Sequence, residues 1–129
     1  MLSNHYLGVW MDHASARLMQ IGNPITETIH SDFSHEIKEE SLFKSESLMH
    51  NKEQHEQSTY YKKIGEEILK YKHVLLFGPT YAKVELLNLL RKDNRFAQVK
   101  IEIKQTDHMT LPQELAFVRA YFKHEPVLM

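Results

Sequence analysis

One continuous apolar run stands out in the chain, the segment VLLF at residues 74–77. A run without polar alternation is typical of a strand buried on both faces, in a sheet that helices cover. Gly78 and Pro79 then break the run, and Thr80 is a suitable N-cap for a helix over residues 81–92. This helix carries a wide apolar stripe that can cover a sheet, made of Leu86, Leu87, Leu89 and Leu90.

Three shorter strands are predicted before this point. They are expected at residues 6–12, 16–21 and 25–30, and turn-forming residues separate them. The third alternates isoleucine with polar side chains, which is typical of a strand near a sheet edge. Because the connections are short, we expect an antiparallel meander.

The region around the apolar run supplies the other elements. A helix capped by Ser58 or Thr59 presents one apolar stripe, Tyr61, Ile64, Ile68 and Tyr71. Residues 98–104 alternate as a half-exposed strand does. Thr110, followed by Pro112 and Gln113, predicts a capping box at the start of the last helix. The buried stripe of that helix is expected to be Leu111, Leu115, Val118 and Phe122.

The segment 31–58 differs from its surroundings. It holds seven acidic and three basic residues, and neither glycine nor proline. Its apolar residues keep no single period, so we expect a mobile insertion with some helix. The order of elements is therefore β-β-β-(insertion)-α-β-α-β-α. That order predicts one domain over residues 1–129, an α/β fold of ribonuclease H-like architecture with a five-stranded mixed sheet and helices packed on it.

Composition adds a few limits. The chain has 129 residues and a net charge of -1, so charge alone favours neither nucleic acid nor membrane. Without cysteine it has no disulfide, thiolate nucleophile or cysteine metal site, which fits a cytoplasmic protein. The N-terminus does not read as a signal peptide, and no apolar run approaches the roughly 20 residues of a membrane span. We therefore expect no membrane partner.

Two aspartates are candidates for catalysis. Asp12 ends the first strand and Asp107 precedes the last helix. In ribonuclease H-like nucleases such carboxylates hold two magnesium ions, and Glu27 or Asp32 would have to complete the set here. The alternative, which we favour, is that both aspartates serve as turn and cap residues.

Other site signals are weak. The nine histidines show no close spacing of the kind that zinc ligands have, so we predict no metal site and no cofactor. The segment Gly78-Pro79-Thr80 lacks the glycines and lysine of a phosphate loop. We favour a simple strand-to-helix turn there, and a weak anion contact at the helix start is the alternative.

Basic residues gather after the central strand. Residues 80–104 hold six lysines and arginines against three acids. Such a cluster can bind a phosphate backbone even when the net charge is near zero, although an ordinary solvated surface is the alternative. The candidate RNA contacts are Lys83, Arg91, Lys92 and Arg95.

Three segments together carry a family resemblance: LGVWMDHASARLM, VLLFGPTYAKVELLNLLRKDNRF and DHMTLPQELAFVRAYF. They resemble bacterial translational machinery proteins. These are relatives of the middle domain of the archaeal and eukaryotic class-1 peptide release factor and of Pelota, the ribosome-rescue factor. The resemblance implies a ribonuclease H-like fold and a ribosome or tRNA partner.

The resemblance also bears on catalysis. In the release factor a Gly-Gly-Gln loop directs water onto the peptidyl-tRNA ester, whereas this chain has no Gly-Gly pair, and its insertion offers only Gln54 and Gln57. We therefore expect a non-catalytic module that binds the translation machinery in rescue, stress or hibernation, alone or as a homo-oligomer. A metal-dependent nuclease using Asp12 and Asp107 is the main alternative. A peptidyl-tRNA hydrolase using Gln54 or Gln57 is a third.

Overall fold

A computed structural model describes residues 6–21, 23–31 and 46–123 of the chain. Its centre is a five-stranded mixed sheet with the strand order β3-β2-β1-β4-β5. The strands are β1 (Tyr6–Met11), β2 (Ser15–Gln20), β3 (Asn23–His30), β4 (His73–Gly78) and β5 (Lys100–Gln105). Strands β1 to β3 form an antiparallel meander, as predicted, and β4 and β5 run parallel to β1.

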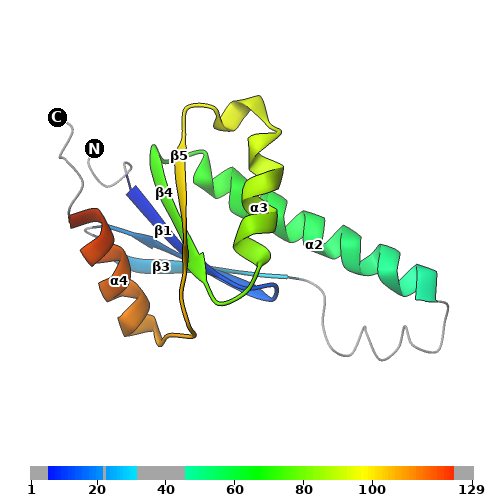
Figure 1. Cartoon of the computed structure of the whole chain (residues 1–129), viewed down its shortest axis with the longest axis horizontal. Coiled ribbons are helices and arrows are strands. Elements are labelled where there is room, and N and C mark those ends of the chain that lie inside the picture. Colours follow the sequence, from blue (N-terminus) through cyan, green and yellow to red (C-terminus); the bar gives the residue numbers. More distant parts are fainter. Residues whose placement is uncertain (1–5, 22, 32–45, 124–129) are drawn as a thin grey trace.

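Helices cover both faces of the sheet. They are α2 (Glu46–Ile68), α3 (Ala82–Arg91) and α4 (Leu111–Lys123), with a short 3-10 turn, η2 (Asn94–Phe96), after α3. Helices α2 and α3 pack on one face and α4 packs on the other (Figure 1). This is the ribonuclease H-like arrangement, so the fold predicted from the order of elements is confirmed.

Strand β4 is buried along its whole length, as its unbroken apolar run predicted. Its side chains alternate between two cores. Val74 and Leu76 join the core under α2 and α3, while Leu75 and Phe77 join the smaller core under α4. The sheet therefore separates two hydrophobic layers, and β4 lies beside β1, the middle strand.

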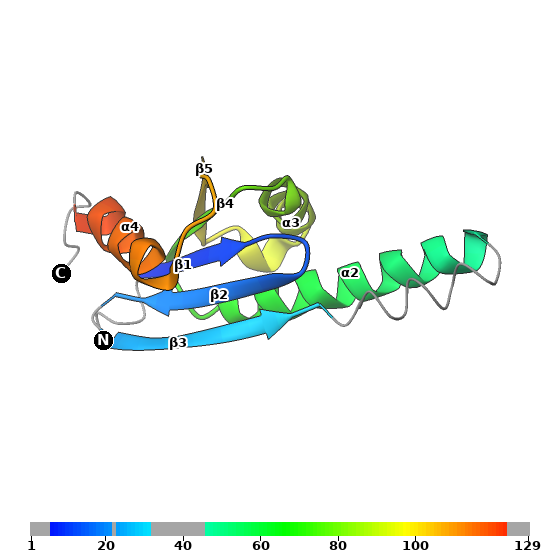
Figure 2. The same ribbon diagram turned by 90° about the horizontal axis from the view of Figure 1, so that it is seen from below.

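Helix α2 begins well before the position that the sequence suggested. It starts at Glu46 rather than near Thr59, so residues 46–58 of the expected insertion are helical. Residues 32–45 of that insertion lie outside the described residues. Figure 2 shows the first half of α2 extending past the sheet, where no other described element packs against it, and this accounts for the missing apolar period. The stripe predicted further along, which starts at Tyr61, is buried.

The turn after β4 depends on Gly78. Its φ is +149°, and a Cβ atom at this position would lie 2.2 Å from the carbonyl oxygen of Met11. Only glycine allows this approach of β4 to the end of β1. The cap of the following helix corrects the prediction, because the N-cap of α3 is Tyr81 and not Thr80. The Thr80 hydroxyl instead accepts a hydrogen bond from the Ala82 N–H at 3.3 Å.

The start of α4 shows the predicted capping box. The Thr110 N–H donates to Gln113 Oε1 at 2.9 Å, and the Gln113 N–H donates to Thr110 Oγ1 at 3.4 Å. The predicted stripe is partly wrong, however. Leu111 is 38% exposed, whereas Glu114 is completely buried beside Val118 and Phe122.

The buried Glu114 carboxylate is paired with Arg17 of β2. Arg17 Nε donates to Glu114 Oε1 at 2.7 Å, and its Nη2 donates to the other oxygen. The guanidinium also lies over the Trp10 ring, 4.3 Å from its centroid. The hydrogen bonds to Glu114 raise the pKa of Arg17 above its usual value. This pair fixes α4 on its face of the sheet and explains why a charged residue replaces the expected leucine in the core.

Close packing of α4 also needs Gly8. A Cβ atom on Gly8 would lie 2.3 Å from a Val118 methyl carbon. We therefore expect Gly8→Ala to destabilise the fold by about 1–3 kcal/mol, because α4 must move outward. In urea denaturation, Gly8→Ala with Val118→Ala should lose less free energy of unfolding than the two single variants added together. Strict additivity would show that the contact is not tight.

The buried ion pair predicts an asymmetry between its partners. Arg17→Met leaves a fully buried carboxylate without its cation and should cost about 3–5 kcal/mol. Glu114→Gln keeps the shape and an acceptor, and Arg17 is partly exposed, so the cost should be about 1–2 kcal/mol. Equal losses in denaturant melts at neutral pH would contradict this description of the pair.

Candidate nucleic-acid interface

Positive charge gathers at the end of the molecule where α3 finishes and β4 and β5 begin. Four exposed cations lie there and are called the basic end: Lys72, Arg91, Lys92 and Lys100. The Lys100 N–H donates to the Lys72 carbonyl at 2.8 Å, which places these two residues side by side. The turn η2 joins the end of α3 to the start of β5 at the top of Figure 1.

Helix geometry accounts for part of this cluster. Arg91 occupies the last turn of α3 and Lys92 is its C-cap, where the helix dipole favours cations. Within the part of the chain that the structure describes, neither side chain has a hydrogen-bond or ion-pair partner. Both charges are therefore free to bind an external anion.

Arg95 lies next to this group, but its charge is already engaged. Its guanidinium donates to both carboxylate oxygens of Asp93, and its Nη1 donates to Glu66 at 3.1 Å. Pairing raises the pKa of Arg95 and lowers the pKa of Asp93. A phosphate would have to compete with two carboxylates for Arg95, so this residue is a weaker candidate than Arg91.

A hollow of about 230 Å³ opens beside the basic end, between α3, η2 and β5. Its apolar lining includes Leu87, Leu90, Phe96, Val99 and Ile101. Arg91, Asp93 and Asn94 line it as well. The hollow therefore lies between the basic end and β5, the last strand of the sheet.

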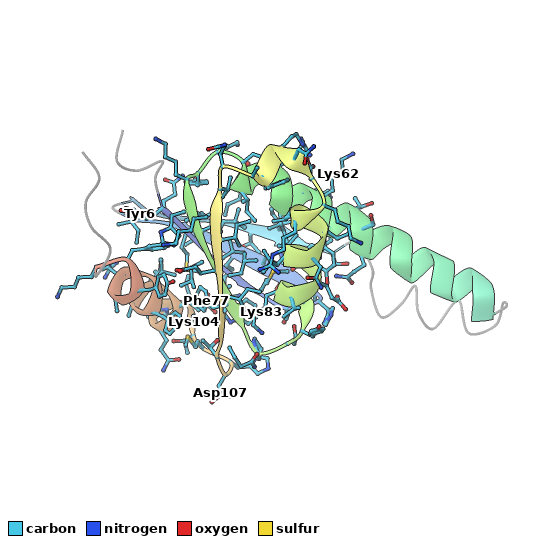
Figure 3. The ribbon with its side chains drawn as sticks, turned by 45° about the horizontal axis from the view of Figure 1, so that its top comes forward. Tyr6, Lys62, Phe77, Lys83, Lys104 and Asp107 are labelled. Carbon is cyan, nitrogen blue, oxygen red and sulfur yellow. The ribbon has the colours of Figure 1, made fainter. Side chains whose placement is uncertain are left out.

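Lys83, the fourth predicted contact, is not at the surface. It is only 2% exposed, and its Nζ donates to the Thr80 carbonyl at 2.6 Å and to Gln105 Oε1 at 2.7 Å. Burial lowers the pKa of this lysine. Figure 3 shows it between α3 and β5, where it ties the start of the helix to the end of the strand. A phosphate backbone cannot reach this ammonium group in the folded protein.

The two candidate catalytic aspartates follow the carboxyl ends of β1 and β5. Asp12 Oδ1 accepts hydrogen bonds from the Ala14 and Ser15 N–H groups, at 2.8 and 2.9 Å. This is an Asx turn, the alternative that the sequence favoured for Asp12. Asp107 is exposed near the tip of the molecule in Figure 3. Among the described residues, no group of three or more histidine, aspartate or glutamate side chains could hold a metal ion, and Asp32 lies outside them.

A further polar cluster lies near Asp12, at the carboxyl end of β1, and was not predicted. His13 Nε2 lies 3.1 Å from Glu85 Oε1, and the Tyr61 hydroxyl donates to the same oxygen at 2.5 Å. Burial and the bond to Glu85 raise the pKa of Tyr61. The Tyr60 hydroxyl donates to the Asp12 carbonyl at 2.9 Å. These contacts fasten the β1–β2 turn to α2 and α3, which is a structural role.

Gln57 belongs to the same junction. Its Nε2 lies 3.4 Å from the His13 carbonyl, and its backbone is in the middle of α2. The side chain of Gln54 lies outside the described residues. Sequence reasoning missed Lys72, and it counted Lys100 in the basic segment without choosing it as a contact. Both lysines lie at the start of a strand, and the two strands are parallel neighbours. The sequence does not show that they are close, because this depends on the pairing of His73 with Lys100.

Comparison with known proteins identifies a fold relative. No protein-family model matches the chain, and no curated protein sequence does. The crystal structure of the Thermoplasma acidophilum Pelota protein is similar, with a TM-score of 0.53 and 14% sequence identity. The match covers 91% of this chain and 31% of that protein. The chain thus shares its fold with a part of Pelota and spans about a third of its length. No helix in the described residues is long and apolar enough to cross a membrane.

The burial of Lys83 can be tested by chemical labelling. With limiting amine-reactive reagent, we expect Lys83 to be modified at least about tenfold more slowly than Lys92, because its amine is exposed only when the helix opens. Peptide mass spectrometry measures both sites in one sample, and the denatured protein is the control. Equal rates in the folded protein would place Lys83 back at the surface.

Proposed function

We propose that this chain is an RNA-binding module of the cytoplasmic translation machinery, which contacts the ribosome or tRNA through the phosphate backbone. The observation that carries the proposal is the likeness of nearly the whole chain to part of the Pelota protein. The segments that resemble translational machinery proteins point the same way. They include the turn GPTY and the start of α4.

The basic end supplies the chemistry. Arg91 and Lys92 are exposed and unpaired within the described residues, and Lys72 and Lys100 extend the positive surface across the start of the sheet. Cations that neutralise phosphates release condensed counterions, so such a surface binds RNA without reading its sequence. Arg91 adds a planar fork of donors that suits phosphate oxygens.

The proposed contact set differs from the sequence-based one in a defined way. Arg91 and Lys92 remain the principal contacts, and Lys72 and Lys100 join them. Arg95 is a secondary contact, because Asp93 and Glu66 hold its guanidinium. Lys83 is left out because it is buried.

Binding without ester hydrolysis is the form of the proposal that fits the chain best. The sequence has no Gly-Gly pair, and Gln57 is held in a helix against the β1–β2 turn. Nothing in the described carboxylates favours the metal-dependent nuclease, since Asp12 is used by its own turn. The module would act by occupying a site on the ribosome or on tRNA.

Charge reversal in the basic end tests the proposal. Arg91→Glu and Lys92→Glu should each weaken binding to purified ribosomes or tRNA at low salt by several-fold, uniformly across RNA sequences. Each should also reduce the slope of log K against log salt by about 1. Fluorescence anisotropy over a salt series measures both quantities.

The matched control is Arg119→Glu. Arg119 is exposed on α4, on the opposite face of the sheet, and the substitution changes the net charge by the same amount. It should leave affinity and salt slope nearly unchanged. If Arg119→Glu weakens binding as much as Arg91→Glu does, only net charge matters and the basic end is not the contact surface.

A further inference from the structure

Strand β5 is an edge of the sheet, and its outer side is open. It pairs with β4 on one side, and no strand follows it in the sheet order. In Figure 2 the strand stands at the margin of the fold, with no described element beyond it. An open edge of regular strand presents hydrogen-bonding groups that can pair with another chain.

The backbone of β5 shows which groups face outward. The Lys100 N–H donates to the Lys72 carbonyl, and the Thr106 N–H donates to the Gly78 carbonyl. Even-numbered residues therefore turn their N–H groups toward β4. By the alternation of a strand, Ile101, Ile103 and Gln105 direct their N–H and C=O groups away from the sheet. No backbone hydrogen bond to these outward groups exists within the described residues.

Side chains on β5 separate by face. Ile101 and Ile103 are half-buried on the side of α2 and α3, where the hollow beside Leu87 and Leu90 leaves apolar surface open. On the other face Lys100, Glu102 and Lys104 alternate in charge along the strand. An added strand could thus cover apolar surface on one face and meet opposite charges on the other.

The charges favour a second copy of the same strand in one orientation. In an antiparallel pair centred on Ile103, Glu102 lies opposite the partner's Lys104, and the twofold axis repeats this contact. Ile103 then faces its own copy, and Ile101 faces Gln105. A shift that centres the pair on Glu102 would set two glutamates against each other and each Lys100 against a Lys104, so the charge pattern selects among registers.

We propose that the chain forms a weak homodimer through antiparallel pairing of β5 with β5 of a second copy, which continues the sheet across the twofold axis. The outward backbone groups of residues 101, 103 and 105 supply the hydrogen bonds, and the two Glu102–Lys104 pairs set the register. Three members of the basic end, Lys72, Arg91 and Lys92, lie outside β5, and the fourth, Lys100, is at its first position, so the dimer would leave most of the proposed RNA contact uncovered.

Complementary charge reversals test the dimer with the full chain. Sedimentation equilibrium should show a monomer–dimer equilibrium for the unmodified protein. Lys104→Glu sets four glutamates across the axis and should raise the dissociation constant about tenfold or more. Glu102→Lys sets four lysines there and should have a similar effect. An equimolar mixture of the two variants restores both opposite-charge contacts and should form a heterodimer at least as readily as the unmodified chain.

Two controls keep the result specific. Arg119→Glu makes the same change of charge as Lys104→Glu and should leave the dissociation constant unchanged. Because Glu102 lies 3.1 Å from His73, the fold of Glu102→Lys is checked by circular dichroism, and Lys104→Glu alone still tests the interface if that variant unfolds. A protein that is monomeric at every concentration, or a dimer insensitive to Lys104→Glu, would overturn the proposal.

Discussion

The pairing of β1 with β4 is the contact on which the rest of the structure depends. Both strands are buried, so each side chain must fit one of two cores, and the strands must also approach closely where they end. Gly78 makes this close approach possible because it has no Cβ atom. A Cβ atom at this position would collide with the Met11 carbonyl. Gly8 meets a related need on the α4 side, where Val118 occupies the space that a side chain would take.

This central pair decides where the two chemically different ends of the molecule lie. Because β4 and β5 run parallel to β1, their starts share one end of the sheet with the end of α3. Helix ends of this polarity favour cations, and the exposed lysines and arginines gather there. The opposite end holds the Asp12 turn and the hydrogen bonds among His13, Glu85 and Tyr61. The topology thus places the basic end, whose charge suits phosphate, at one end of the sheet. At the opposite end the polar side chains hydrogen-bond to one another and to the β1–β2 turn.

Local patterns predicted the sheet better than the positions of charged groups. The buried strand, the meander and the capping box at Thr110 each have a short-range signal in the sequence. The early start of α2 has none, since its first half lies beyond the core and needs no apolar stripe. Glu114 in the core could not be foreseen, because its partner Arg17 lies on β2, far from α4 in the sequence.

The sequence also could not predict which individual lysines are buried. Lys83 and Lys92 belong to the same basic segment, yet Lys83 is enclosed between Thr80 and Gln105 and Lys92 is exposed. Lys83 lies at the start of α3, where β5 covers it, whereas Lys92 caps the other end of the helix. A local sequence pattern does not show which strand packs beside a helix end. Charge counts therefore indicated a segment that carries exposed cations, and they included Lys83, whose ammonium group is buried.

Association with ribosomes in a native lysate tests the central claim most directly. The tagged protein would be run on sucrose gradients at low and moderate salt, with a magnesium-chelated sample in which the ribosomal subunits separate. We expect co-migration with a subunit or with the intact ribosome, weakening as salt rises because phosphate contacts carry the binding. Protein found only at the top of the gradient under every condition, together with no binding to tRNA, would contradict the translation role and leave the likeness to Pelota as a likeness of fold.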